Sequence, residues 1–288
     1  MPYLCQKFLD LKNISSFKYT LNWTESSILI GGFVAGQILV GIIGVFMLLV
    51  LRQNFETSPV FLLSAYVLSM GLPILAFDLF VTRPKGFKLN FNFSSRSPIT
   101  YILVLMMMIG MMLISEFLTS FIPTTGPVFG GLYEFFSKQM ESIALDGFLL
   151  VIMVAVLAPI FEEILFRGII LKGMLNRGVE PMKAIIFSSL IFGIIHGNPW
   201  QFLGAFLLGL VLGFVYYKTR SLLLPILLHA FNNFFAAMML IYIKKESIAE
   251  VFQTKEIYLF GIGILIFSIG YYLFMKKYPT EKGIEQSI

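Results

Sequence analysis

Long apolar segments separated by short polar ones make up almost the whole chain. Eight of them approach the ~20 residues that a helix needs to cross the hydrocarbon core of a bilayer, although the fifth and sixth are short. They cover residues 28–51, 59–81, 99–121, 146–166, 183–199, 200–217, 221–243 and 257–275. Between the fifth and sixth segments, Gly197 and Pro199 break the helix and indicate a turn. The pattern predicts an all-α polytopic membrane protein with about eight transmembrane helices.

Composition places the chain in the same class. Hydrophobic residues make up 58% of its 288 residues and charged ones 13%, whereas a soluble domain carries roughly 25% charged residues. The net charge of +5 suits contact with anionic headgroups. It does not indicate nucleic-acid binding, because no basic run with interleaved aromatic residues accompanies it. Cys5 is the only cysteine, which excludes an internal disulfide and a cysteine-based zinc site.

Basic residues are distributed unevenly between the loops. With eight spans, fifteen of the 21 Lys and Arg residues fall on the side that holds both termini, and five fall on the opposite side. Positively charged loops stay inside, so we expect both termini in the cytoplasm. The N-terminus lacks the features of a cleaved signal peptide. Leu4, Phe8 and Leu11 have helical spacing, which predicts a short helix on the inner membrane surface within residues 3–20.

Two acids and a base lie in or beside the fourth apolar segment. Glu162, Glu163 and Arg167 occur in the string FEEILFR, and each charge at membrane depth costs ~2.5–3.5 kcal/mol on insertion scales. Residues four apart share one face of a helix, while neighbours diverge by ~100°. We therefore expect Glu163 to pair with Arg167, and Glu162 to point elsewhere, free to face a cavity. A structural ion-pair cluster of all three is the alternative.

The only two histidines of the chain also lie in apolar segments. Phe192 and His196 are about one helical turn apart, so the aromatic ring could wall one side of the imidazole. His229 and Asn233 have the same spacing, and both can donate hydrogen bonds toward a single point. Taken singly, His196 is interpreted as a buried histidine whose hydrogen bonds are satisfied. The pair of His229 and Asn233 is interpreted as a clamp between helices. Their coincidence with the acidic pair in consecutive helices favours an active site.

These residue types suit hydrolysis by an activated water. A glutamate beside a histidine can take a proton from water. Two donors opposite can hold the oxyanion that forms when water attacks a carbonyl. A protein nucleophile is not indicated, because Cys5 lies outside the group, and Ser188 and Ser189 have no motif around them.

Three motifs in this order resemble one family. They are EExxxR (Glu162 to Arg167), FxxxH (Phe192 to His196) and HxxxN (His229 to Asn233). Together they resemble the CAAX-protease and bacteriocin-processing (CPBP) intramembrane proteases, also called the Abi family, and in particular its type II CAAX prenyl endopeptidases. Each motif alone is weak, but three ordered motifs at these spacings are specific. The resemblance covers roughly residues 145–243 and implies an all-helical bundle around a buried polar cavity.

The resemblance implies a role for each motif. Glu162 would be the general base, and His196 would be its partner on the attacking water. His229 and Asn233 would form the oxyanion site. The residues that would support these four are Glu163, Arg167 and Phe192.

The same resemblance implies the reaction and its surroundings. Eukaryotic members cleave the last three residues from prenylated CAAX proteins, and bacterial members are linked to peptide or bacteriocin processing, self-immunity and surface-protein functions. We therefore expect an intramembrane endopeptidase of the bacterial inner membrane that acts on a membrane-associated or lipidated peptide. Residues 146–243 would be its catalytic core. A cytoplasmic N-terminal segment, supporting helices, and a last span with a cytoplasmic tail would occupy residues 1–27, 28–145 and 244–288.

Metal dependence stays open on the sequence. Two histidines and a carboxylate resemble a catalytic zinc ligand set, so the candidate zinc ligands are Glu162, His196 and His229. Members of the family have been classed both as metalloproteases and as glutamate proteases. The spacing of the residues does not decide between them, and we favour water activation without tightly bound metal.

Two other functions fit the same residues. Some members of the family act as scaffolds, and a non-catalytic immunity or scaffold protein predicts that Glu162→Ala leaves the phenotype intact. A transporter with Glu162 and His196 as a proton relay predicts flux that depends on a proton gradient. No internal repeat supports a repeat-built transporter.

Overall fold

The computed structural model describes residues 19–50, 52, 58–144, 147–245 and 247–279. Within them the chain is helical and has no strand, which confirms the predicted all-α class. The helices are α2 (Trp23–Val50), α3 (Pro59–Phe77), α4 (Pro98–Thr119), α5 (Gly126–Ala144), α6 (Gly147–Val151), α7 (Ala158–Glu163), α8 (Lys172–Asn176), α9 (Pro181–Ile194), α10 (Pro199–Thr219), α11 (Leu223–Met238), α12 (Ile248–Val251) and α13 (Glu256–Lys277). Shorter turns continue them: the π-helical η2 (Asp78–Thr82), η4 (Ile152–Leu157), η5 (Ile164–Leu171) and η6 (Met239–Ile243), and the 3-10 turn η3 (Arg83–Lys85).

Seven helices in the described part of the chain are long and apolar enough to cross a membrane. They are Trp23–Val50, Val60–Lys85, Pro98–Thr119, Gly147–Asn176, Pro199–Thr219, Leu223–Ile243 and Glu256–Lys277. The fifth predicted segment corresponds to α9, which has only 14 residues. The polytopic class is therefore confirmed, while the count of eight spans is not. The N-terminal surface helix predicted within residues 3–20 lies outside the described residues, which begin at 19.

The fourth span is longer than its apolar pattern predicted. It covers 30 residues from Gly147 to Asn176, whereas the pattern placed its end at residue 166. The helix continues because Arg167 is fully buried and ion-paired, so the apolar residues after it extend the same helix. Glu162 and Glu163 consequently lie near the middle of this span rather than at its end.

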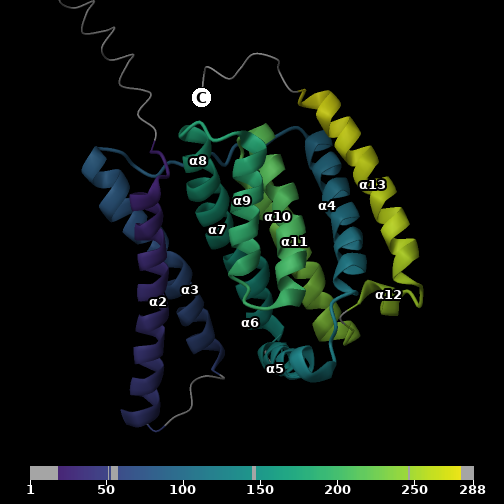
Figure 1. The fold of residues 1–288 in the computed structure, drawn as a ribbon, viewed down its shortest axis with the longest axis horizontal. Helices are drawn as coiled ribbons and strands as arrows, with labels where there is room; N and C mark the ends of the chain where they lie inside the picture. The colour runs from purple at the N-terminus through teal and green to yellow at the C-terminus, as the bar shows by residue number, and fades with distance from the viewer. Residues whose placement is uncertain (1–18, 51, 53–57, 145–146, 246, 280–288) are drawn as a thin grey trace, which may run out of the picture.

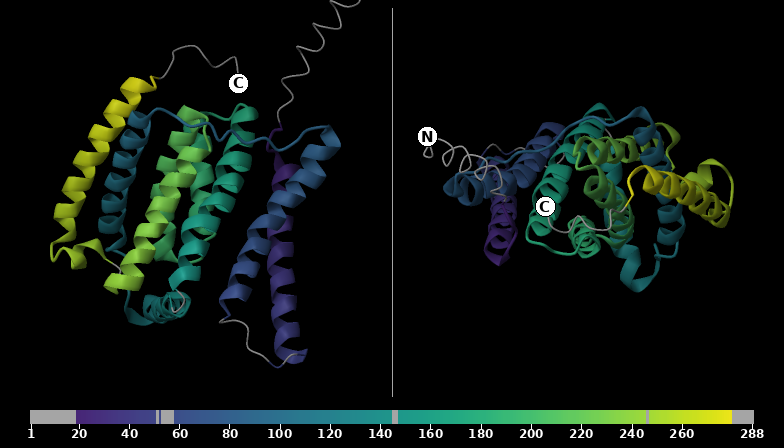
Figure 2. Two further views of the ribbon diagram at one scale, coloured as in Figure 1. Left: turned by 180° about the vertical axis from the view of Figure 1, so that it is seen from behind. Right: turned by 90° about the horizontal axis from the view of Figure 1, so that it is seen from above.

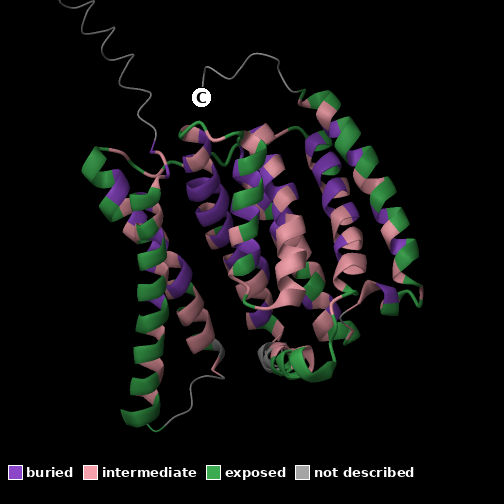
Figure 3. Cartoon of the chain, viewed as in Figure 1, coloured by how far each residue is buried: buried purple, intermediate pink, exposed green. Residues whose placement is uncertain are grey.

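The α2–α3 hairpin lies at one side of the molecule and the α4–α13 pair at the other, with α6 to α11 between them (Figures 1 and 2). Buried residues gather on the central helices, whereas much of α2 and α13 is exposed (Figure 3). The exposed side chains there are large and apolar, such as Ile38 in α2 and Leu265 in α13. Helices that are apolar on their outer side suit a bundle surrounded by lipid.

Small residues let helices α4 and α13 pack closely. A Cβ atom added to Gly110 of α4 would lie 2.6 Å from the backbone nitrogen of Phe267 and 2.7 Å from the carbonyl oxygen of Gly263, both in α13. Any larger residue at this position would force the two backbones apart. The pair buttresses α10, which carries part of the candidate site.

A strap of irregular chain between η3 and α4 crosses one end of the bundle (Figure 1). The carbonyl of Asn92 in this strap accepts a hydrogen bond from the backbone N–H of Leu222 at 2.7 Å. The carbonyl of Asn90 accepts another from the ammonium group of Lys172 at 2.8 Å. The strap therefore ties the end of the fourth span to the start of α11.

Helix α5 and the C-terminal end of α13 lie at opposite ends of the bundle (Figure 1). Reporter enzymes fused after the C-terminus and at Ser137 of α5 are therefore expected to report opposite sides of the membrane, with the C-terminal reporter in the cytoplasm. The loop charges predict this orientation. The measurement is the activity of a paired cytoplasmic and extracytoplasmic reporter at each position, and the same side for both would contradict the arrangement.

Candidate functional site

A buried ion pair lies in the middle of the fourth span. Nη1 of Arg167 donates to Oε1 of Glu163 at 2.7 Å, and both side chains are 0% exposed. Nη2 of Arg167 donates to the carbonyl oxygen of Gly209 in α10 at 3.0 Å. The guanidinium carbon also lies 4.8 Å from the ring centroid of Phe192. The predicted pairing of Glu163 with Arg167 is confirmed, and it connects the fourth span to α9 and α10.

His229 of α11 joins this ion pair from the other side. Its Nδ1 lies 2.9 Å from Oε1 of Glu163. An ionised carboxylate oxygen can only accept, so Nδ1 carries the proton, and Nε2 of a neutral ring then holds a lone pair. Nε2 lies 3.7 Å from Oε2 of Glu162. That distance is longer than a direct hydrogen bond, so the two atoms are adjacent but not bonded.

Glu162 has a hydrogen-bond partner that its own motif does not indicate. The hydroxyl of Tyr66 in α3 donates to Oε1 of Glu162 at 2.7 Å. The Glu162 side chain is 9% exposed. One carboxylate oxygen is thus held by Tyr66, and the other faces the imidazole of His229. The two adjacent acids point to different partners, as their ~100° divergence on a helix requires.

The ring of Phe192 contacts both histidines. Its centroid is 5.2 Å from that of His196 and 5.5 Å from that of His229, with both contacts edge-to-face. Nδ1 of His196 lies 2.8 Å from the carbonyl oxygen of Phe192. A carbonyl can only accept, so Nδ1 is again the donor, and Nε2 of a neutral His196 is unprotonated.

His196 does not lie within a helix. Helix α9 ends at Ile194, and Gly197 follows with φ of 71°. Asn198 then caps the next helix, its Oδ1 accepting from the backbone of Gln201 at 2.9 Å. Of the two histidines, the structure places His229 beside Glu162, at 3.7 Å, while His196 contacts the ring of Phe192 from the turn after α9.

Asn233 is fixed by two hydrogen bonds. Its Nδ2 donates to the carbonyl oxygen of Val154 at 2.7 Å, and its Oδ1 accepts from Nδ2 of Asn232 at 3.0 Å. Val154 lies in the π-helical turn η4 of the fourth span. A carboxamide nitrogen has two N–H groups, and the bond to Val154 uses one of them.

The structure does not bring the candidate zinc ligands Glu162, His196 and His229 together as one group, and the metal-dependent alternative stays a prediction. Among the described residues, no group of three His, Cys, Asp or Glu side chains could hold a metal ion. Both histidines hold an oxygen at Nδ1, which leaves Nε2 of each ring as the atom that would bind a metal ion.

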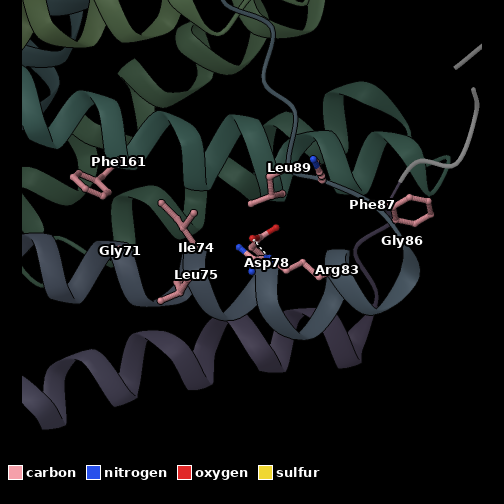
Figure 4. A pocket seen from close by; sticks show the side chains of 10 residues that line it. Gly71, Ile74, Leu75, Asp78, Arg83, Gly86, Phe87, Leu89 and Phe161 are labelled. Atoms are coloured by element: carbon pink, nitrogen blue, oxygen red, sulfur yellow. Dashed lines mark hydrogen bonds and ion pairs between the residues drawn. The ribbon is translucent and has the colours of Figure 1, made fainter.

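A cavity of about 750 Å³ lies along α3, beside the fourth span (Figure 4). Phe161, the neighbour of Glu162, lies at one end of it, and the ion pair of Asp78 and Arg83, 2.8 Å long, lies toward the other. The residues that line it are Gly71, Ile74, Leu75, Asp78, Arg83, Gly86, Phe87, Lys88, Leu89 and Phe161. The acids and histidines of the site are not among them, so the predicted buried polar cavity is not confirmed.

Removal of Arg167 should destabilise the fold. Arg167→Ala leaves the carboxylate of Glu163 buried without its ion-pair partner, and breaking a buried pair in this way costs about 3–5 kcal/mol. We expect a lower melting temperature in detergent. The matched control is Lys138→Ala, which breaks the exposed pair with Glu134 and should leave the melting temperature unchanged. Equal melting temperatures for Arg167→Ala and the wild type would contradict a stabilising role.

The fold and the site together define a polytopic helical membrane protein with a buried cluster of two glutamates, an arginine and a histidine. Residues 144–235 match the family described as type II CAAX prenyl endopeptidase Rce1-like. That range contains every motif residue of the cluster. The resemblance predicted from the three motifs is thereby confirmed for this part of the chain.

Curated relatives of the chain include membrane proteins described as peptidases. YdiL of Bacillus subtilis (strain 168), described as a candidate membrane peptidase, is 35% identical over 32% of this chain and 37% of its own length. The membrane-embedded CAAX protease MroQ of Staphylococcus aureus (strain USA300) is 31% identical over 31% of this chain and 38% of its own length. The chain thus spans less than two fifths of the length of these two relatives. No solved structure matches it.

Proposed function

We propose that the protein is an intramembrane endopeptidase that hydrolyses a peptide bond in a membrane-associated peptide by means of an activated water. The observation that carries this proposal is the different surroundings of the two adjacent acids. Glu163 is engaged by Arg167 and His229, whereas Glu162 keeps one oxygen beside an imidazole. A buried carboxylate that has no arginine or lysine partner is suited to accept a proton.

In the proposed reaction, Glu162 takes a proton from water while the resulting hydroxide attacks the carbonyl carbon of the peptide. Nε2 of His196 accepts a hydrogen bond from the same water and orients it. The remaining N–H of Asn233 donates to the developing oxyanion. When the C–N bond breaks, Glu162 passes its proton to the leaving amine, so that one water is consumed and the carboxylate of Glu162 is regenerated.

The charge of the cluster assigns a second task to His229. Two ionised glutamates and one guanidinium leave one uncompensated negative charge, and a protonated His229 would balance it. Since Nδ1 already donates to Glu163, only the imidazolium form presents an N–H at Nε2. His229 would therefore contribute to the oxyanion site in its protonated form.

The cavity along α3 supports the choice of a membrane-associated substrate. Its lining is apolar near Phe161 and contains Asp78, Arg83 and Lys88 toward the other end. An amphiphilic substrate would place its apolar part beside the fourth span and its polar part toward the strap. A prenylated CAAX-like peptide and a bacteriocin or leader peptide both have this character.

A non-catalytic scaffold is the second candidate, and one observation favours it. His196 and Asn233 each have a hydrogen bond inside the bundle, to the carbonyls of Phe192 and Val154. A scaffold would use these bonds only to hold helices together. Because the scaffold needs no proton acceptor, it predicts that Glu162 can be replaced without consequence.

A comparison of membrane peptides from cells with wild-type and Glu162→Gln protein tests the proposed function. We expect an uncleaved peptide to accumulate with the variant and its products to disappear, at equal amounts of both proteins in the membrane. Identical peptide profiles together with an unchanged phenotype would favour the scaffold.

Tyr66 is expected to position the base. Tyr66→Phe removes the hydroxyl that donates to Glu162, and a hydrogen bond to a charged group contributes about 1.5–3 kcal/mol. We therefore expect kcat to fall roughly tenfold or more, with little change in KM. The matched control is Tyr101→Phe, which removes an exposed hydroxyl that lies 2.9 Å from Oγ of Ser95 in the strap.

The double variant Tyr66→Phe/Glu162→Gln tests whether Tyr66 acts by positioning Glu162 or by packing elsewhere. In a Glu162→Gln background, Tyr66→Phe should cause no further loss of activity, because the two residues act as one unit. A full additional loss would show that Tyr66 acts elsewhere.

A further inference from the structure

Helix α5, which the apolar pattern of the sequence did not predict, packs one of its faces against Trp200. The ring of Trp200 lies 6.3 Å from that of Phe129, 5.0 Å from Tyr133 and 6.0 Å from Phe136, between centroids. The three α5 positions are spaced four and three residues apart, so they share one side of the helix. Trp200 belongs to the first turn of α10, and α5 is therefore docked onto the bundle beside the turn that follows α9.

A second face of α5 is apolar and has no protein against it. Val128 is 68% exposed, Leu132 is 55% exposed and Phe135 is 71% exposed. Their spacing of four and three residues again puts them on one side of the helix. At ~100° per residue, this stripe lies roughly 100° around the helix from the side that holds Trp200.

A third face of α5 is charged. Glu134 and Lys138 form an i,i+4 pair of 2.6 Å, with side chains 67% and 71% exposed. By the same ~100° rule, the mean direction of this pair is roughly 100° from the apolar stripe and roughly 150° from the aromatic face. The helix thus has three faces, which suit three different surroundings: protein, an apolar medium and water.

We propose that α5 is an interfacial helix that lies along the boundary between lipid and water. The stripe of Val128, Leu132 and Phe135 would enter the upper acyl-chain region, and Glu134 and Lys138 would face water. The occupant follows from position, because α5 connects the end of the span α4 to the start of the span at Gly147, at one end of the bundle (Figures 1 and 2). A helix with one apolar and one charged face takes this orientation at a membrane.

Fluorescent labels at single cysteines test the proposal. In the full-length Cys5→Ser protein, Leu132→Cys and Phe135→Cys report the stripe, while Glu134→Cys and Lys138→Cys report the charged face. Each is labelled with a polarity-sensitive dye and reconstituted into vesicles of phosphatidylethanolamine and phosphatidylglycerol. Quenching is measured with aqueous iodide, with a lipid nitroxide near the headgroup and with one near the chain end. A label at Leu265→Cys, midway along α13 and 61% exposed, is the deep control.

We expect the two stripe labels to be quenched several-fold more by the shallow nitroxide than by the deep one, and little by iodide. The two charged-face labels should show strong iodide quenching, and the Leu265 label should respond most to the deep nitroxide. All labelled positions are exposed, and melting temperatures check that each variant is folded.

Three outcomes would overturn the proposal. Equal iodide quenching of all four α5 labels would place the helix in water. Strong quenching by the deep nitroxide would place it inside the bilayer. Shielding of the stripe labels from every quencher, with disulfide cross-linking between Leu132→Cys copies, would show that a second copy of the chain covers the stripe.

Discussion

Purified Glu162→Gln protein is expected to lose peptide-bond cleavage while it keeps the melting temperature of the wild type. The substitution exchanges one oxygen for an amide nitrogen of nearly the same size, and the remaining oxygen can still accept from the hydroxyl of Tyr66. The packing of the site is therefore conserved. A carboxamide cannot accept the proton of the attacking water, and loss of a general base typically costs ~10²–10⁴ in rate.

The adjacent acid supplies the matched control. Glu163 accepts from both Arg167 and His229 and is fully buried, so Glu163→Gln should first of all lower the melting temperature. The pair of variants thus separates a chemical loss from a structural one. Cleavage by Glu162→Gln protein at the wild-type rate would contradict the hypothesis that Glu162 is the base.

Helical periodicity was enough to predict the local part of the site. The four-residue spacing of Glu163 and Arg167 sets their pairing, and the one-residue offset of Glu162 turns it away, as the hydrogen bonds show. These relations depend only on helix geometry. Contacts between helices are different, because they depend on how each helix is rotated about its own axis. The occurrence of both histidines in consecutive apolar segments grouped them with the acids, but it could not tell that His229, rather than His196, lies beside Glu162.

Tyr66 shows the limit most clearly. It lies 96 positions before its partner, in a hairpin that was interpreted as purely supporting. A tyrosine in an apolar span is common, and only the packing of α3 against the fourth span reveals that its hydroxyl meets a carboxylate. The available signal was that Glu162 needed a donor.

The ends of helices were also difficult to predict. Gly197 and Pro199 correctly indicated a turn, but apolar residues continue up to it, so the pattern did not show that α9 ends at Ile194. Helix α5 was missed for a related reason. Its apolar residues are divided between two faces, and with charges on the third face the segment resembles neither a span nor a simple amphipathic helix.

Replacement of Asn233 by alanine should lower kcat far more than it raises KM. In the proposed reaction, Asn233 donates to charge that exists only in the transition state. Loss of one such donor typically costs ~10²–10³ in kcat. The carboxamide is already oriented by its bonds to Val154 and Asn232, so the remaining N–H needs little reorganisation to act. Because a carboxamide does not titrate, the loss should be nearly the same at every pH.

A clamp between helices predicts a different result for the same variant. Asn233→Ala also breaks the bond to Val154, which connects α11 to the fourth span, and a hydrogen bond of this kind contributes about 0.5–1.5 kcal/mol to stability. A clamp would therefore lower the melting temperature, with activity falling only in proportion to folded protein. Asn232→Ala is the matched control, because it releases the Asn233 oxygen but leaves its nitrogen in place, and it should cost less activity. Melting temperature and kcat measured on one preparation separate the two roles. A large stability loss with normal activity per folded molecule would rule out Asn233 as an oxyanion donor.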